Sequence, residues 1–64
     1  MTISERIFKI MKEKGMTQLQ LSGKTGIGQS TISDWKTKGT DPSASKIMEI
    51  CKALDCTPYD ILED

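Results

Sequence analysis

The sequence predicts an all-α domain, a compact arrangement of five helices within 64 residues. Apolar residues recur at three- and four-residue spacings, and residues typical of helix caps interrupt this pattern about every 10 to 15 residues. No segment alternates apolar and polar residues with the period of two that marks a strand. One domain is expected over residues 1–64. Its five helices are expected at residues 4–14, 18–25, 29–37, 43–54 and 58–62.

The first helix is predicted from a cap, an apolar stripe and a stop. Ser4 is the expected N-cap and Gly15 the expected end, since glycine readily adopts the left-handed conformation that follows a helix. The apolar stripe follows helical spacing. It consists of Ile3, Ile7, Ile10 and Met11.

The second and third helices are short and separated by a tight Gly-Ile-Gly turn, residues 26–28. Thr17 is expected to cap the second helix, with Leu21 facing inward together with Leu19 or Thr25. Gly26 is expected to end that helix in a conformation with positive φ, which glycine adopts without strain. Ile32 and Trp35 are the expected inward residues of the third helix.

The fourth and fifth helices also carry caps and apolar faces. Ser43 is the expected cap of the fourth helix, and Pro58 occupies the first position of the fifth, where proline is tolerated. The fifth helix carries Ile61 and Leu62. The inward positions of the fourth helix are Ile47, Ile50, Cys51 and Leu54.

The composition excludes several classes of protein. Two cysteines and no histidine are too few ligands for a disulfide framework or a zinc site, so Cys51 and Cys56 are expected to fill the core of a cytoplasmic protein. No apolar run approaches the ~20 residues that span a bilayer. The chain lacks a phosphate-cradling loop, a clustered acid pair and a base for either thiol, so no enzyme activity, catalytic residue, metal, cofactor or small-molecule ligand is expected.

Charge is distributed unevenly along the chain, although the formal net charge is zero. Residues 1–38 contain seven Lys or Arg against three Asp or Glu, whereas residues 39–64 contain two against six. The basic half includes the Gly-Ile-Gly turn and the third helix, whose outer face is small and polar and begins with Gln29 and Ser30. Two short helices around a tight turn, the second with a polar outer face, are typical of a helix-turn-helix that binds DNA.

Several residues of this chain resemble the lambda-repressor-like helix-turn-helix family, of the Cro and repressor type. They are Thr17-Gln18, Leu21, Gly26-Ile27, Ile32-Ser33, Trp35 and the closing segment 56–62. The resemblance covers residues 4–62 and implies a transcriptional regulator, a repressor, that binds double-stranded DNA. It implies a weak dimer on a pseudo-palindromic operator, with helix 29–37 in the major groove. The alternative is a protein-interaction or antitoxin-type module of the same fold, which zero net charge favours.

The chain departs from the family pattern at a few positions. Family members often pair an Arg on the first helix with a Glu after the aromatic residue of the third helix, and Met11 and Lys36 stand at these positions here. Lys36 is therefore expected to face solvent, because a lone buried charge costs several kcal/mol. Gly23 within the second helix, with Ser22 and Thr25 in place of apolar residues, predicts a looser helix than usual.

Five residues of the third helix are candidates for reading bases. A glutamine can pair with adenine, and an aspartate can accept from the N4 amine of cytosine. Asp34 is equally expected to pair with Lys38 one turn later. The candidates are Gln29, Ser30, Thr31, Ser33 and Asp34.

Other candidates serve phosphate contacts and dimerisation. The family resemblance and the exposed N–H groups at a helix start imply that Gln18 contacts a phosphate. The remaining phosphate candidates are Lys36, Thr37, Lys38 and Ser43. Pro58 and Tyr59, with Ile61 or Leu62, are the expected dimer patch; alternatively, Ile61 and Leu62 close the core and Tyr59 is partly exposed.

Overall fold

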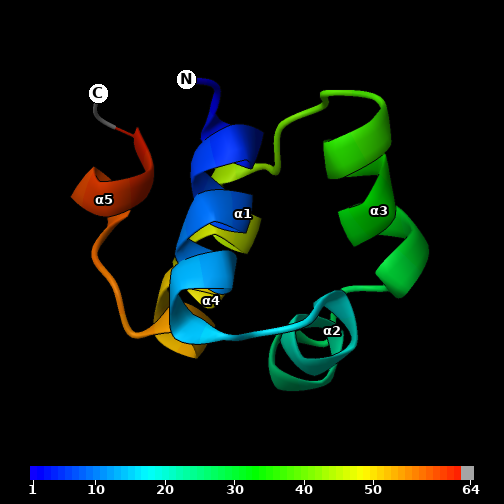
Figure 1. The fold of residues 1–64 in the computed structure, drawn as a ribbon, viewed down its shortest axis with the longest axis horizontal. Helices are drawn as coiled ribbons and strands as arrows, with labels where there is room; N and C mark the ends of the chain where they lie inside the picture. Colours follow the sequence, from blue (N-terminus) through cyan, green and yellow to red (C-terminus); the bar gives the residue numbers. More distant parts are fainter. Residues whose placement is uncertain (63–64) are drawn as a thin grey trace.

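The computed structural model describes residues 1–62, which form five helices in the predicted order and contain no strand (Figure 1). The helices are α1 (Ile3–Lys14), α2 (Gln18–Thr25), α3 (Gln29–Thr37), α4 (Ala44–Leu54) and α5 (Pro58–Leu62). Each boundary agrees with its prediction to within one residue. Local caps and apolar spacing were therefore sufficient to locate every helix.

The cap of α1 is Thr2, not Ser4 as predicted. The Thr2 hydroxyl accepts a hydrogen bond from the Glu5 N–H at 3.1 Å, and the Glu5 carboxylate accepts one from the Thr2 N–H at 2.8 Å. This reciprocal pair is a capping box, which Ser4 could not form. Ser4 is instead buried, and its hydroxyl donates toward the Thr40 carbonyl and the Asp41 carboxylate. Ser4 thus attaches the start of α1 to the loop before α4.

Helix α2 begins as predicted, and of the two alternatives for its second inward position, Leu19 and Thr25, the structure supports Thr25. Thr17 and Gln20 form a second capping box, with N–H to oxygen distances of 2.9 and 3.1 Å. Leu21 has no exposed surface, whereas Leu19 is 63% exposed. Residues two apart on a helix do not share a face, so Leu19 cannot point inward beside Leu21. Thr25, one turn after Leu21, takes the inward position, and its hydroxyl donates to the Leu21 carbonyl at 2.8 Å.

The core lies where α1 and α4 meet and is closed by the three shorter helices. In Figure 1, α1 and α4 occupy the middle of the molecule, with α5 on one side of α1 and α3 on the other. Helix α2 packs on α4 and α3, and α1 packs on α3, α4 and α5. The buried apolar side chains are Ile7, Met11, Leu21, Ile27, Ile32, Trp35, Ile47, Ile50, Cys51, Leu54 and Ile61.

The two cysteines lie at the end of α4 and are both free thiols. Cys51 is buried and Cys56 is half-buried, and the Cys56 N–H donates to the Cys51 carbonyl at 3.0 Å across the helix end. Burial, followed by the neighbouring Cys51, raises the pKa of Cys56 to about 11. The thiols are therefore protonated at neutral pH, and Cys51 fills the core as predicted.

Candidate nucleic-acid interface

The turn between α2 and α3 is held by both polar and apolar contacts. Gly26 adopts a left-handed conformation with φ of 76°, as predicted for the residue that ends α2. The Ser22 hydroxyl donates to the Ile27 carbonyl at 2.6 Å, and the Ile27 N–H donates to the Thr25 hydroxyl at 3.2 Å. The Ile27 side chain is buried in the core. Together these contacts fix the direction in which α3 leaves the turn.

Ser22 and Thr25 make hydrogen bonds that were not predicted from the sequence. These residues replace apolar ones in the family pattern, and their hydroxyls bond to the backbone within α2 and across the turn. The looser α2 expected from these positions stays a prediction. Ser and Thr side chains commonly bond to nearby backbone groups, which is the signal that could have identified them. Polar contacts at these two positions therefore add to the apolar anchor provided by Ile27.

Helix α3 turns its polar face to solvent. Ile32 and Trp35 point into the core, with 0% and 4% of their surfaces exposed. The N-cap, Gly28, has no side chain to bond the first N–H groups of α3. None of the five candidate base-reading residues is buried: Gln29, Ser30 and Thr31 are exposed, and Ser33 and Asp34 are half-buried. The polar face is therefore available at the surface.

Two candidates near the end of α3 already have partners within the helix. The Asp34 carboxylate lies 3.7 Å from the Lys38 ammonium, in an exposed i,i+4 pair. The Thr37 hydroxyl donates to the Ser33 carbonyl at 3.0 Å. A hydroxyl has one hydrogen, so Thr37 would have to give up this bond before it could donate to a phosphate.

Met11 and Lys36, which stand where family members often carry an ion pair, have the burial predicted for them. Met11 is buried, with 3% of its surface exposed, and Lys36 faces solvent. The Lys36 ammonium lies over the ring of Phe8 on α1, 5.9 Å from the ring centroid. This contact between a cation and an aromatic face was not predicted from the sequence, since Phe8 and Lys36 are far apart along the chain.

The other phosphate candidates lie at two helix starts. Gln18 is the first residue of α2 and is half-buried, and Ser43 is the exposed N-cap of α4. The Ser43 side chain makes no capping bond; its hydroxyl lies 3.3 Å from that of Ser45. The free N–H groups at the start of α4 remain a suitable site for an anion.

The predicted dimer patch requires one correction. Ile61 has no exposed surface and belongs to the core, so it cannot contact a second chain. Tyr59 and Leu62 are 72% and 51% exposed, and Pro58 is half-buried. Within a short helix only part of the surface can face outward, and Ile61 is the residue of α5 that closes the core. The exposed apolar side chains of α5 are thus Tyr59 and Leu62.

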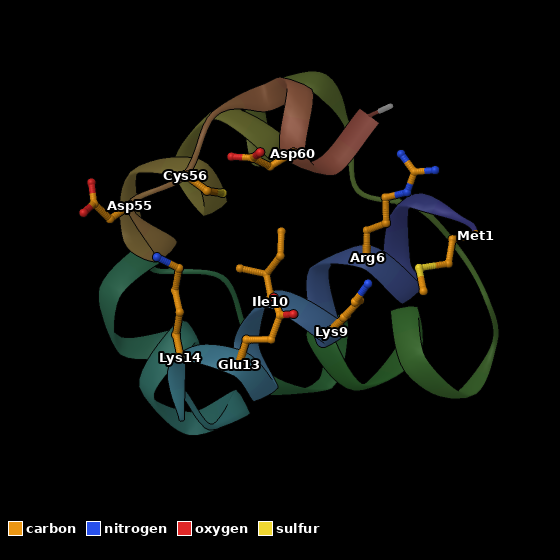
Figure 2. Close-up of a pocket in the computed structure, with 9 residues that line it drawn as sticks. All are labelled: Met1, Arg6, Lys9, Ile10, Glu13, Lys14, Asp55, Cys56 and Asp60. Carbon is orange, nitrogen blue, oxygen red and sulfur yellow. The ribbon is translucent and has the colours of Figure 1, made fainter. Parts of the chain in front are cut away.

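A pocket on the side of α1 that faces α5 is lined by side chains of both charges. It has a volume of about 490 Å³ and lies between α1 and the segment that joins α4 to α5 (Figure 2). Lys14 and Asp60 extend into it from opposite walls, while the Asp55 carboxylate points away. Within residues 1–62, no three His, Cys, Asp or Glu side chains are grouped so that they could hold a metal ion. None of the helices in that range is long and apolar enough to cross a membrane.

Comparison with known proteins identifies the family of the chain. A family model described as the Cro/C1-type HTH DNA-binding domain matches residues 6–64. The crystal structure of the P22 c2 repressor in complex with synthetic operator 9T has 29% sequence identity and a TM-score of 0.83, covering 100% of this chain and 98% of the repressor chain. No curated protein matches the chain.

Two further solved structures share the fold. The solution structure of the DNA-binding domain of the P22 c2 repressor has 29% identity and a TM-score of 0.85, covering 100% of this chain and 86% of that domain. The restriction-modification controller protein C.AhdI from Aeromonas hydrophila has 22% identity and a TM-score of 0.84, covering 94% of this chain and 91% of the controller. At that identity the controller supports the fold alone.

Proposed function

Because the chain belongs to the Cro/C1-type helix-turn-helix DNA-binding domain family, we propose that it is a repressor that binds a pseudo-palindromic operator as a dimer. The family confirms the lambda-repressor-like resemblance and the predicted fold class, and it makes the chain a DNA-binding transcriptional regulator rather than an enzyme. The P22 c2 repressor, with a bound operator, supports the repressor role.

The polar face of α3 is the observation that carries the proposal. Its small polar side chains take no part in the core, and the turn before it is fixed by hydrogen bonds. In the proposed complex α3 lies in the major groove, and Gln29 pairs with an adenine. Asp34 accepts from the N4 amine of a cytosine. The other proposed base contacts come from Ser30, Thr31 and Ser33.

Phosphate contacts come from the surroundings of α3. Gln18 at the start of α2 and Ser43 at the start of α4 present helix N-termini, which favour an anion. Lys36 and Lys38 supply positive charge near the end of α3. Thr37 can join them by exchanging its bond to Ser33 for one to a phosphate. These contacts would set the position of the protein on the duplex without specifying sequence.

Dimerisation through α5 would bring two copies of α3 to successive major grooves, ~34 Å apart. Tyr59 and Leu62, with Pro58, provide the exposed apolar surface for this contact. The patch is small, so we propose that the dimer forms mainly on DNA. Tyr59→Ser should abolish pairing on the operator and leave the core intact, because Tyr59 is exposed; analytical ultracentrifugation of the complex measures this.

Selection from a pool of random duplexes at moderate salt is the first test. We expect an inverted repeat with half-sites about one helical turn apart. With the selected operator, Gln29→Ala should relax preference at one base by ~1–3 kcal/mol and leave the salt dependence unchanged. Circular dichroism shows whether the protein is folded throughout. A folded protein that enriches no sequence would contradict the proposal.

A protein-interaction module of the same fold is the second candidate, because the chain has zero net charge and an aspartate on the polar face of α3. Binding to DNA through several phosphates predicts a steep fall in affinity with salt, with a slope of about −0.9 for each phosphate. Weak DNA binding with no sequence preference would favour this second candidate over the first.

A further inference from the structure

An open groove runs between α1 and the end of α3 and is rich in lysine. Its volume is about 780 Å³, and it lies on the opposite side of α1 from the pocket of Figure 2, although Met1 and Lys9 border both. Its lining residues among positions 1–62 include one carboxylate, Glu5, whose oxygen accepts the Thr2 N–H at 2.8 Å in the cap of α1. The lysines that line it are Lys9, Lys12, Lys36 and Lys38. The groove therefore has a clear excess of positive charge.

Phe8 holds one of the lysines of this groove in position. Its ring packs against the core and carries the Lys36 ammonium 5.9 Å from its centroid. Lys12 follows Phe8 by one helical turn, so it lies on the same side of α1. Phe8 and Lys12 from α1 thus face Lys36 from α3 across the groove. An ammonium held over an aromatic ring loses less freedom when it binds an anion than a lysine that moves freely.

The charges in the groove are not neutralised within the protein. Among residues 1–62, Lys9, Lys12 and Lys36 form no ion pair, whereas Lys38 pairs with Asp34. Two ammonium groups on facing helices, Lys12 and Lys36, are therefore available to an anionic partner. Surface lysines without carboxylate partners repel one another weakly, and a bound phosphate would relieve this repulsion.

The groove is continuous with the face of α3 proposed to read bases. Lys36 follows Gln29 by seven residues, or two helical turns, so both lie on the same flank of α3. We propose that the groove between α1 and α3 binds backbone phosphates of the duplex just outside the bases read by α3, through Lys12 and Lys36. This inference rests on the proposed function. A duplex fits the groove better than an acidic protein segment because the same helix would already lie against DNA.

The test measures how binding depends on salt. The probe is a fluorescent duplex carrying the selected operator with ~10 extra base pairs on each side, and binding is followed by anisotropy. Replacing both lysines (Lys12→Gln with Lys36→Gln) should make the slope of log affinity against log salt shallower by about 1.8 for each bound protomer, which corresponds to two lost phosphates. Base preference should be unchanged, because phosphate contacts carry no sequence information.

A matched control separates local contacts from the general effect of charge. Lys14→Gln with Lys52→Gln removes the same charge from the last turns of α1 and α4, and neither residue lines the groove. This double variant should change the slope by much less. On a duplex trimmed to the half-sites, the difference between the parent protein and the Lys12, Lys36 variant should vanish, since the flanking phosphates are gone.

Phe8 is tested as a positioning residue. Phe8→Leu keeps an apolar side chain in place but removes the aromatic face. It should weaken binding by no more than about two- to fivefold, because the exposed cation–π contact that positions Lys36 in the free protein is worth no more than this. Combined with Lys36→Gln, it should add no further loss of affinity. A purely structural role would instead make the two losses add, and thermal unfolding by circular dichroism monitors the core.

The outcomes separate this inference from the proposed function. If the parent protein binds no duplex with sequence preference, the proposed function itself fails. If the parent binds its operator but the Lys12, Lys36 variant retains the full salt slope on the long duplex, the groove does not bind DNA and the inference is overturned. An equal reduction of slope in the Lys14, Lys52 control would overturn it as well.

Discussion

The reading unit, residues 17–37, and the scaffold helix α4 are held in place by different forces. Helix α4 buries four apolar side chains in 11 residues, whereas the 21 residues of the reading unit also bury four, and α2 contributes only Leu21 to them. The reading unit compensates with a capping box and with hydroxyl groups that bond to the backbone across its turn. Apolar burial gives most of the folding free energy but little directionality, while hydrogen bonds depend strongly on geometry. The scaffold thus supplies stability and the turn supplies the angle of α3.

The largest effect on stability is expected in the scaffold. Ile50 has no exposed surface, so Ile50→Ala should lower the free energy of unfolding by ~2–5 kcal/mol, through lost burial and a residual cavity. Urea unfolding measures this. Met48 on the same helix is 51% exposed, and Met48→Ala should change stability by no more than ~0.5 kcal/mol. Similar losses at the two positions would show that α4 does not form the core as described.

A smaller loss of stability, with a larger loss of binding, is expected in the turn. Ser22→Ala removes the donor to the Ile27 carbonyl and should cost ~1 kcal/mol of unfolding free energy. Because the direction of α3 depends on this bond, DNA affinity should fall further than the fraction of folded protein does. Anisotropy with the selected operator and urea unfolding measure the two effects.

Ser45→Ala is the matched control for Ser22. Its hydroxyl contacts only that of Ser43 within residues 1–62, and it lies at the exposed start of α4. Stability should change little there. If folded Ser22→Ala binds DNA with the affinity of the parent protein, the hydrogen bonds of the turn do not set the direction of α3.

Two glycines of the reading unit should respond to alanine in opposite directions. Gly23 lies within α2, and nothing is within 4 Å of the position a Cβ would take. Gly23→Ala should therefore stabilise the protein by up to ~1 kcal/mol, from helix propensity. Gly26 has equal space but a φ of +76°, so Gly26→Ala should cost ~1–2 kcal/mol. Thermal unfolding measures both; stabilisation by both would mean that the turn does not require a left-handed residue.

Sequence patterns predicted the helices because caps and apolar spacing are local signals. The same locality explains the errors at α1. Ser4 has the residue type of a cap, but its partners Thr40 and Asp41 lie 36 and 37 residues away along the chain. A spacing rule has no information on such a contact. Thr2, two residues earlier, had the more complete signal, since Glu5 stands at the position that completes a capping box.

The candidate site was predicted in part for the same reason. The polar face of α3 follows from helical spacing around Ile32 and Trp35, and its exposure agrees with the prediction. The groove between α1 and α3 did not emerge from the sequence, because Phe8 and Lys36 meet only through tertiary packing. Ile61 was placed on the surface as one alternative because a five-residue helix carries too little periodicity to separate it from Leu62.

Among these substitutions, the smallest effect on stability is expected for Asp34→Asn in the reading unit. This substitution should change which base the protein prefers. Its exposed pair with Lys38, at 3.7 Å, is worth only ~0.2–0.5 kcal/mol, so Asp34→Asn should barely alter urea unfolding. An aspartate accepts from cytosine N4 and an asparagine pairs with adenine, so repeating the selection should convert one cytosine of the operator to adenine.

Glu49→Gln, which removes a similar exposed pair with Lys52 at 3.9 Å on α4, should leave the operator unchanged. If Asp34→Asn keeps the operator and only tightens binding at low salt, then Asp34 serves to hold Lys38 and the reading of cytosine is wrong. Because stability is nearly constant in both cases, this substitution isolates recognition from folding more cleanly than any change in the core.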